Sequence, residues 1–378
     1  MKYLLILLLF PFILNAQTIG RQSVDSFPRN VFGTRTYALV WLPQSYTSTQ
    51  RSYPLIIFLH GAGETGTTIS DLSRLNNTGL PGRIAGGFNP VAVNPRTGIA
   101  DSFIVVSPQA SSWSYSYTEL KFILPAVLTK YRVDKSRIYL TGLSAGGGGT
   151  FSTFGSKDIP FINQFAAMAT ASSAGTNASN GYNAVEVESN LKFGSFYGPR
   201  KWTVAGEADY LLTTDVRYHD STNWLEPFPA NKLTVIAGVG HSAWNQMYNP
   251  AFRPVINYYG RTGTCNNGCA FGGVPVAPNN NGSTVRGSGV TQDSLNVYEW
   301  FLLHERKLTA LSLPPDAPPA APFSLKPDME DHGTYWKFNR RGTVTIYRID
   351  GARLQVVQVI VGATIIKQSI TDKAIFYR

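Results

Sequence analysis

One serine of this chain stands in a pattern that favours nucleophilic chemistry. The pentapeptide GLSAG, residues 142–146, follows the β-type run RIYLT and opens a glycine-rich stretch. A serine hydroxyl is a weak nucleophile at neutral pH unless a neighbouring base takes its proton. A G-x-S-x-G turn between a strand and a helix strains the serine backbone and projects its hydroxyl above the sheet. The pattern therefore predicts Ser144 as a nucleophile.

Candidates for the base and the acid come later in the chain. Two further β-type runs, WTVA and LTVIA, lead into polar loops that hold Asp209 and His241. With this kind of turn the acid and then the histidine are expected to follow the serine in sequence. We therefore expect His241 to accept and return the proton of Ser144, while Asp209 orients the imidazole ring. Glu207, which precedes Asp209 by two residues, is the alternative acid.

The other four histidines fit the role of the base less well. His60 directly follows an apolar run and is expected to make structural hydrogen bonds. His219 lies in a polar stretch and is expected to be exposed. The remaining two, His304 and His332, lie on the last helix of the main domain and just beyond a proline-rich linker.

Attack on a carbonyl also requires N–H donors aimed at the oxyanion that forms. One donor is expected from the backbone of Ala145, directly after the nucleophile. The second is expected from the loop HGAGE, residues 60–64, whose small residues allow a substrate to approach the main chain. Ala62 is the predicted second donor, with Gly61 as the alternative.

Aromatic residues lie near these motifs in the sequence. Trp113, Tyr115 and Tyr117 follow the run FIVVS, and Trp244 follows the candidate base by three residues. They could form an apolar or sugar-stacking wall, with Trp113 and Trp244 as the candidate substrate-binding residues. The alternative is that these rings pack in the core.

The elements that must position these residues alternate between β-type runs and helical patterns, which is typical of a mostly parallel sheet covered by helices. The helical patterns cover 119–131 and 294–307. The expected strands are 36–42, 53–59, 103–107, 137–141, 165–169, 202–205 and 233–237.

The segments outside this core predict export and a separate C-terminal part. Residues 1–16 resemble a signal peptide, with Lys2 ahead of an apolar run that ends near a small residue, Ala16. The catalytic domain is expected over 17–310, with a Gly/Asn-rich insertion at about 256–293. A Pro/Ala-rich linker at 311–330 leads to a β-rich segment at 331–378.

Composition excludes several other classes of function. The chain is 43% apolar and 15% charged, and its formal charge of +10 is scattered rather than gathered in a basic stripe, so nucleic acid is not an expected partner. No later run is long enough for an integral membrane segment. The two cysteines, Cys265 and Cys269, predict a local disulfide in an exported protein and no metal site. The oligomeric state stays open.

Together, YPLIIFLHGAGE, RIYLTGLSAGG, the GEAD loop and GHSAW resemble the secreted esterase group related to polyhydroxybutyrate depolymerases and family-1 carbohydrate esterases. The resemblance covers about 35–307. It implies an α/β-hydrolase fold, cleavage of carboxylic esters without a cofactor, and the triad Ser144, Asp209 and His241. The insertion with both cysteines departs from the family. In the tail, VTIYRIDGARLQ faintly resembles type IX secretion sorting domains; a plain β accessory module is the alternative.

A secreted carboxylic ester hydrolase is therefore the expected function, and export favours an acylated polysaccharide or a polyester as substrate. A serine peptidase of the prolyl-oligopeptidase type would share the fold and the triad order, but the large gating domain of such peptidases has no room before Arg35. The third hypothesis is a non-catalytic surface or carbohydrate-binding protein on a hydrolase scaffold.

Overall fold

The chain folds as two units, Met1–Leu308 and Thr309–Arg378. The computed structural model describes residues 20–113, 115, 117–174, 191, 199–222, 231–254, 257–259 and 294–306, and beyond them strands between 329 and 377. The predicted signal peptide, the linker and the cysteine pair, Cys265 and Cys269, lie outside the described residues.

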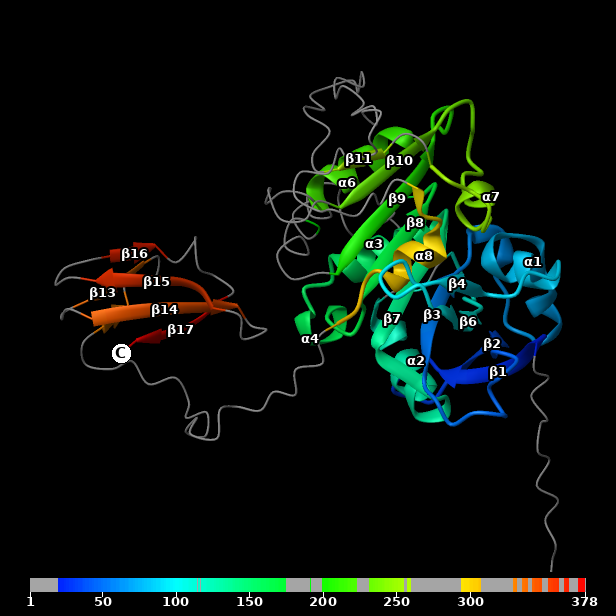
Figure 1. The fold of residues 1–378 in the computed structure, drawn as a ribbon, viewed down its shortest axis with the longest axis horizontal. Helices are drawn as coiled ribbons and strands as arrows, with labels where there is room; N and C mark the ends of the chain where they lie inside the picture. The colour runs from blue at the N-terminus through cyan, green and yellow to red at the C-terminus, as the bar shows by residue number, and fades with distance from the viewer. Residues whose placement is uncertain are drawn as a thin grey trace, which may run out of the picture. The chain divides into compact units, whose positions relative to one another are not determined.

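A nine-stranded sheet forms the frame of the first unit, in the order β1-β2-β6-β3-β7-β8-β9-β10-β11 (Figure 1). The six strands from β6 to β10 in that order run parallel, while β1, β2 and β11 are antiparallel to their neighbours. The strands are β1 (Gln22–Pro28), β2 (Arg35–Trp41), β3 (Tyr53–Leu59), β6 (Ile104–Pro108), β7 (Val133–Leu143), β8 (Ala167–Ala171), β9 (Arg200–Gly206), β10 (Lys232–Ile236) and β11 (Asn257–Tyr259). A small hairpin, β4 (Val91–Val93) with β5 (Ala100–Ser102), lies apart from this sheet.

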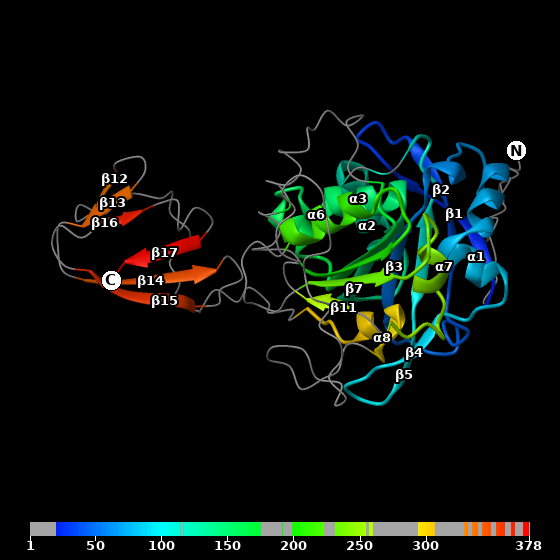
Figure 2. The same cartoon turned by 90° about the horizontal axis from the view of Figure 1, so that it is seen from above.

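Helices cover both faces of the sheet (Figure 2). On one face lie α2 (Tyr117–Lys130), α3 (Ala145–Phe154) and α6 (Leu212–Thr222), and on the other lie α1 (Gly79–Ala85), α7 (Trp244–Met247) and α8 (Val297–Leu302). Short helical turns η1 (Ala62–Glu64), η2 (Ser70–Asn77) and α4 (Ile159–Ile162) complete the unit.

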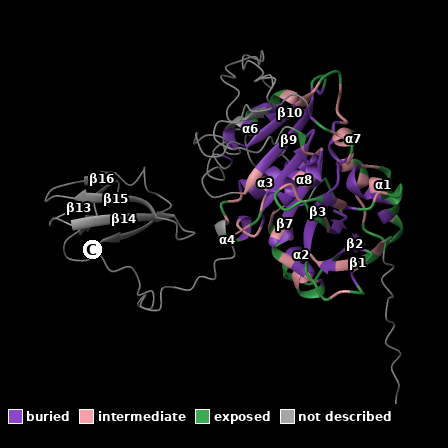
Figure 3. Ribbon diagram, viewed as in Figure 1, coloured by how far each residue is buried: buried purple, intermediate pink, exposed green. Residues whose placement is uncertain are grey.

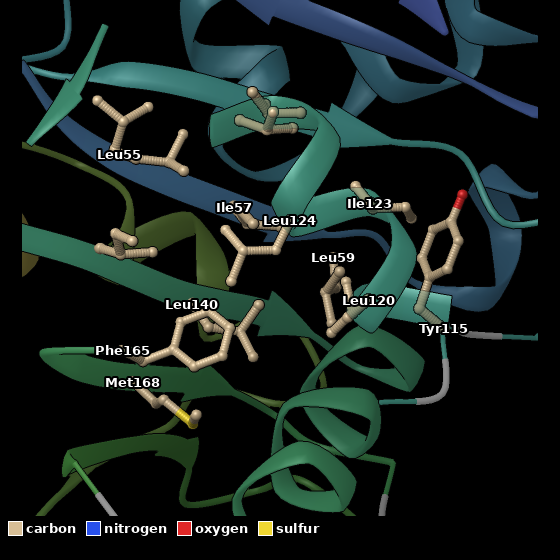
Figure 4. Close-up of a cluster of buried hydrophobic side chains, with 14 of the residues drawn as sticks. Leu55, Ile57, Leu59, Tyr115, Leu120, Ile123, Leu124, Leu140, Phe165 and Met168 are labelled. Atoms are coloured by element: carbon tan, nitrogen blue, oxygen red, sulfur yellow. The ribbon is translucent and has the colours of Figure 1, made fainter. Parts of the chain in front are cut away.

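The strand β3 shows why a continuous apolar run suits this frame. Leu55, Ile57 and Leu59 face the cluster under α2 and α3 (Figure 4), whereas Ile56 and Phe58 face the cluster under α1 and α8. Successive side chains of a strand point to opposite faces, so a strand covered on both sides must be apolar throughout. All of β3 is accordingly buried, as are β6 and β8 (Figure 3).

The predicted mostly parallel sheet with flanking helices is confirmed, but some elements differ. The polar edge strand β1 was not predicted. The last helix covers 297–302 instead of 294–307. It begins later than predicted because Asn296 caps its first turn with the Glu299 side chain in a reciprocal capping box. His219, predicted to be exposed, is fully buried on α6 beneath the sheet, so that prediction is wrong.

The C-terminal unit is built from strands alone in its described part. One three-stranded sheet has the order β12-β13-β16 and the other β15-β14-β17. The strands are β12 (Met329–Asp331), β13 (Tyr335–Phe338), β14 (Gly342–Arg348), β15 (Arg353–Val359), β16 (Thr364–Ile366) and β17 (Lys373–Tyr377). The prediction of a β-rich tail is confirmed.

The turn that joins β7 to α3 is packed so tightly that two positions admit no side chain. A Cβ added to Gly142 would lie 2.3 Å from the carbonyl oxygen of Gly146. A Cβ added to Gly146 would lie 2.1 Å from the carbonyl oxygen of Leu59 on β3. These contacts are with backbone, which cannot move aside as a flexible side chain can.

Gly142→Ala should therefore lower the free energy of unfolding by at least about 2 kcal/mol, the usual cost of overpacking a dense core. Urea unfolding of this variant and wild type measures the change. Gly63→Ala is the matched control, because a Cβ at Gly63 would meet nothing within 4 Å. Equal stability of Gly142→Ala and wild type would contradict the packing argument.

Candidate active site

Four loops that follow the carboxyl ends of parallel strands bring the predicted residues together at that end of the strands. Ser144 follows β7, Asp209 follows β9 and His241 follows β10, while Gly61 and Ala62 follow β3. Strand β3 is the neighbour of β7, and β8 alone separates β7 from β9. Side chains distant in sequence therefore meet beyond the carboxyl ends of the central strands.

Ser144 sits in a strained backbone conformation. Its φ is 48° and its ψ is −117°, and it is the residue that precedes the first turn of α3. A non-glycine residue in such a region costs about 1–3 kcal/mol and persists only where its surroundings fix it. Ser144 is the sharp corner that the G-x-S-x-G pattern predicts.

A continuous hydrogen-bonded chain links the three predicted triad residues. The Oγ of Ser144 lies 2.9 Å from Nε2 of His241. The Nδ1 of His241 lies 3.1 and 3.0 Å from Oδ1 and Oδ2 of Asp209. The side chain of Asp209 is fully buried and that of His241 is 24% exposed. This arrangement can hold Nδ1 protonated and leave Nε2 free to accept the hydroxyl proton.

The two candidate acids have different partners. The Oδ1 of Asp209 also accepts a 2.9 Å hydrogen bond from the backbone N–H of Leu211, which orients the carboxylate. Glu207 is exposed, and its Oε2 accepts a 2.9 Å hydrogen bond from the N–H of Gly238 in the loop after β10. Asp209 thus contacts the imidazole, while Glu207 joins the two loops.

Three observations identify the fold. They are the strand order, the strained serine between strand and helix, and the order serine, acid, histidine along the chain. The chain has the α/β-hydrolase fold. No protein-family model and no curated protein matches it.

Solved structures similar to the chain include a thermostable esterase, with 22% identity over 61% of this chain and a TM-score of 0.45. The chain spans 60% of the length of that esterase. A ferulic acid esterase has 19% identity over 60% of this chain and 92% of its own, with a TM-score of 0.43. An S-formylglutathione hydrolase from Agrobacterium tumefaciens has 15% identity over 59% of this chain and 89% of its own, with a TM-score of 0.42.

The predicted oxyanion donors occupy equivalent positions in two different turns. Ala145 is the first residue of α3, and Ala62 is the first residue of η1, with Gly61 before it. The first N–H groups of a helical turn have no partner within the turn, so they are free to bind a ligand oxygen. The two loops are adjacent, because a Cβ added to Gly61 would lie 3.5 Å from the Cβ of Ser144.

His60 fastens the loop that carries Ala62, as predicted for a structural histidine. It is buried, its Nε2 accepts a 2.8 Å hydrogen bond from the N–H of Ala110, and its Nδ1 lies 2.6 Å from the carbonyl oxygen of Gly61. Since Nε2 accepts, Nδ1 must carry the proton and donate it to Gly61. Burial lowers the pKa of His60 to about 4, although the bond to Gly61 opposes the shift.

Two aromatic rings flank His241. The Trp244 ring lies 5.2 Å from the imidazole in an edge-on arrangement, and the Tyr210 ring lies 5.0 Å from it. Trp244 was predicted to be near the site. Tyr210, which is 78% exposed, was missed, although its position directly after Asp209 was a usable signal.

The other predicted aromatics do not form a wall at His241. Trp113 is 42% exposed in the loop that follows β6, and no ring contact within the described residues joins it to the triad. Tyr115 is buried and lies 2.6 Å from the Thr36 hydroxyl, and Tyr117 packs against the core. Tyr115 and Tyr117 thus follow the alternative expectation, since the first is buried in the hydrophobic core and the second, partly buried, packs against it.

Nothing in the described part of the chain resembles a metal centre. No group of three or more histidine, cysteine, aspartate or glutamate side chains comes together there in a way that could hold an ion. Among the same residues, no helix is both long and apolar enough to cross a membrane.

The geometry distinguishes the two acids in a reactivity test. Asp209→Asn should slow covalent labelling of Ser144 by a fluorophosphonate about 10³-fold or more, because the imidazole loses the partner that fixes its tautomer. Glu207→Gln should label within a few-fold of wild type, since its side chain binds Gly238 instead. The measurement is the second-order labelling rate. The reverse ranking would assign the acid to Glu207.

The low pKa of His60 predicts a pH-dependent stability. Its pKa falls from 6.5 to about 4 on folding. Between these values the unfolded chain binds a proton at residue 60 that the folded chain does not, so stability is present above pH 6.5 and is lost as pH falls. The loss at pH 5 should be about 2 kcal/mol.

Urea unfolding at pH 7 and pH 5 measures this loss, and His60→Gln should reduce the difference between the two pH values by that amount. An unchanged difference in His60→Gln would show that other groups carry the pH dependence.

Proposed function

We propose that this chain is a serine carboxylic-ester hydrolase that works through an acyl-enzyme intermediate. The observation that supports the proposal most strongly is the unbroken chain of hydrogen bonds from Ser144 through His241 to Asp209. A serine held at a strained turn, with a base at 2.9 Å and a buried acid behind it, has the parts that nucleophilic acyl transfer requires.

In the acylation step, Ser144 Oγ attacks the ester carbonyl carbon while His241 Nε2 takes its proton. The carbonyl oxygen becomes an oxyanion, which would accept hydrogen bonds from the N–H groups of Ala62 and Ala145. Collapse of this intermediate breaks the bond to the alcohol oxygen. His241 returns the proton to that oxygen, so the alcohol leaves neutral and the acyl group stays on Ser144.

In the deacylation step, water takes the place of the alcohol. His241 accepts a proton from the water as its oxygen attacks the acyl carbon, and then returns the proton to Ser144 as the acid departs. Asp209 stays ionised and stabilises the imidazolium in both steps. Its burial strengthens this interaction, because charges attract more strongly away from water.

We further propose an exported enzyme whose substrates are acylated polysaccharides or polyesters. The basic and then apolar N-terminal residues support export. Tyr210 and Trp244 support an acyl or sugar moiety that packs against aromatic rings beside His241.

Purified protein tested on 4-nitrophenyl acetate and butyrate checks the proposal directly. Wild type should hydrolyse both esters, and Ser144→Ala should lower kcat by about 10³-fold or more. Ser23→Ala is a matched control, because Ser23 lies on the edge strand β1 with its hydroxyl bonded to the carbonyl oxygen of Val40. This control should retain wild-type kcat.

Two outcomes would overturn the proposal. Cleavage of peptide substrates without ester hydrolysis would indicate a peptidase of the prolyl-oligopeptidase type. Background rates for wild type and Ser144→Ala alike, on every ester and peptide, would indicate a non-catalytic binding protein.

A further inference from the structure

A second buried acid lies on the same helix-loop unit as Asp209. Asp215 sits in the first half of α6, and it is fully inaccessible to solvent. Its Oδ1 and Oδ2 lie 3.2 and 3.1 Å from the backbone nitrogen of Ser173, so one N–H is shared between both oxygens. The triad chemistry described above does not use Asp215.

Ser173 belongs to a short segment, Ala171 to Ala174, that is bonded to the nucleophile on both sides. The N–H of Ser144 donates a 3.0 Å hydrogen bond to the carbonyl oxygen of Ala171. The carbonyl oxygen of Ser144 accepts a 2.9 Å hydrogen bond from the N–H of Ala174. The peptide groups on either side of the strained serine are thus held by one neighbouring segment, which we call the clamp.

The clamp is strained and tightly packed. Ser172 has a φ of 46°, a left-handed conformation that a serine rarely adopts without support. Ser173 is fully buried against α3, since a Cβ added to Gly147 would lie 2.6 Å from its hydroxyl oxygen. Movement of Ser173 would therefore disturb both the clamp and the first turn of the helix that begins after Ser144.

Asp215 is the side chain that fixes the clamp from the helical layer. Helix α6 is tied to the acid loop, because the N–H of Leu212 donates a 3.0 Å hydrogen bond to the carbonyl oxygen of Asp209. Figure 2 shows α6 on the same side of the sheet as α3. Asp209 therefore lies just before the start of α6, and Asp215, which contacts the clamp, lies within the first turns of the same helix.

The oxygen atoms of Asp215 matter here more than its charge. Burial raises the pKa of Asp215 to about 8, and the nearby Lys201 opposes this shift. Lys201 is itself buried, with its Nζ bonded to the hydroxyls of Thr170 and Thr203 at 3.2 and 2.9 Å, and burial lowers its pKa. The contact with the clamp needs only an oxygen that accepts the Ser173 N–H, and an amide supplies one as a carboxyl group does.

We propose that Asp215 is a positioning residue for the nucleophile: by accepting the Ser173 N–H, it holds the clamp that keeps Ser144 in its reactive conformation. The inference rests on the proposed role of Ser144. In this role Asp215 does not contact the substrate. It affects the chemical step through the backbone of Ser173, which belongs to the segment bonded to Ser144.

Asp215→Ala and Asp215→Asn separate positioning from simple stabilisation. In Asp215→Ala the Ser173 N–H loses its acceptor, and kcat for 4-nitrophenyl acetate should fall about 100-fold with KM nearly unchanged, the usual cost of a small misplacement of a reacting atom. In Asp215→Asn the amide oxygen can still accept the N–H, and kcat should stay within about 5-fold of wild type, because the hydrogen bond to Ser173 is kept.

Asn296→Ala is the matched control. Asn296 is also a buried side chain whose oxygen accepts backbone N–H groups, those of Tyr298 and Glu299 at 3.0 and 2.9 Å, but it acts at the start of α8, on the opposite face of the sheet from α6. This variant should lose stability and keep wild-type kcat. If Asp215→Ala does not fold, Asp215→Ser replaces it, because its hydroxyl ends one bond short of the carboxyl oxygens and should behave in the same way.

The inference is overturned if the folded Asp215→Ala or Asp215→Ser variant keeps kcat within 3-fold of wild type, or if Asp215→Asn fails to restore it. The fluorophosphonate labelling rate of Ser144 supplies a readout that needs no ester substrate. Labelling that slows in Asp215→Ala and recovers in Asp215→Asn supports the clamp even if wild type hydrolyses no ester. That combination would refute the proposed function alone.

Discussion

The structure depends on one constraint, which is that Ser144 must stay at a positive φ between a strand and a helix. The glycines at 142 and 146 remove the side chains that would collide there, and the backbone of β3 closes over the turn. Hydrogen bonds from the clamp then hold the peptide groups on both sides of the serine. The local strain is offset because strand, helix and clamp each lose contacts if the turn relaxes.

The sheet distributes the remaining parts around that turn. Because β3, β7, β9 and β10 are parallel, their carboxyl ends lie at one edge, and each contributes one loop to the site. Exposure increases along the triad, from a fully buried Asp209 side chain to a His241 side chain that is 24% exposed. In the proposed mechanism, the charge that would stabilise the imidazolium is thus kept away from water, while part of the imidazole remains exposed to solvent.

Much of this arrangement could be predicted because it leaves a strong pattern in the sequence. The run 53–59 is buried on both faces and therefore apolar at every position, and its predicted bounds match β3. The sequence of the edge strand β1 is polar and alternates only weakly between apolar and polar residues. It therefore could not be distinguished from the sequence of a loop. The error at His219 has a tertiary cause: α6 is polar in sequence, but the sheet covers one side of it, and burial there was not visible from composition.

The contacts that support this site could not be predicted in detail where their partners are backbone groups. Ser144, Asp209 and His241 bind one another, so their types and order along the chain carry the signal. His60 binds the main chain of Gly61 and Ala110, and Asp215 binds the main chain of Ser173. Any residue can supply a backbone N–H, so such contacts leave no pattern of residue types. The support of this site is therefore found in its geometry, whereas its reacting groups are found in its motifs.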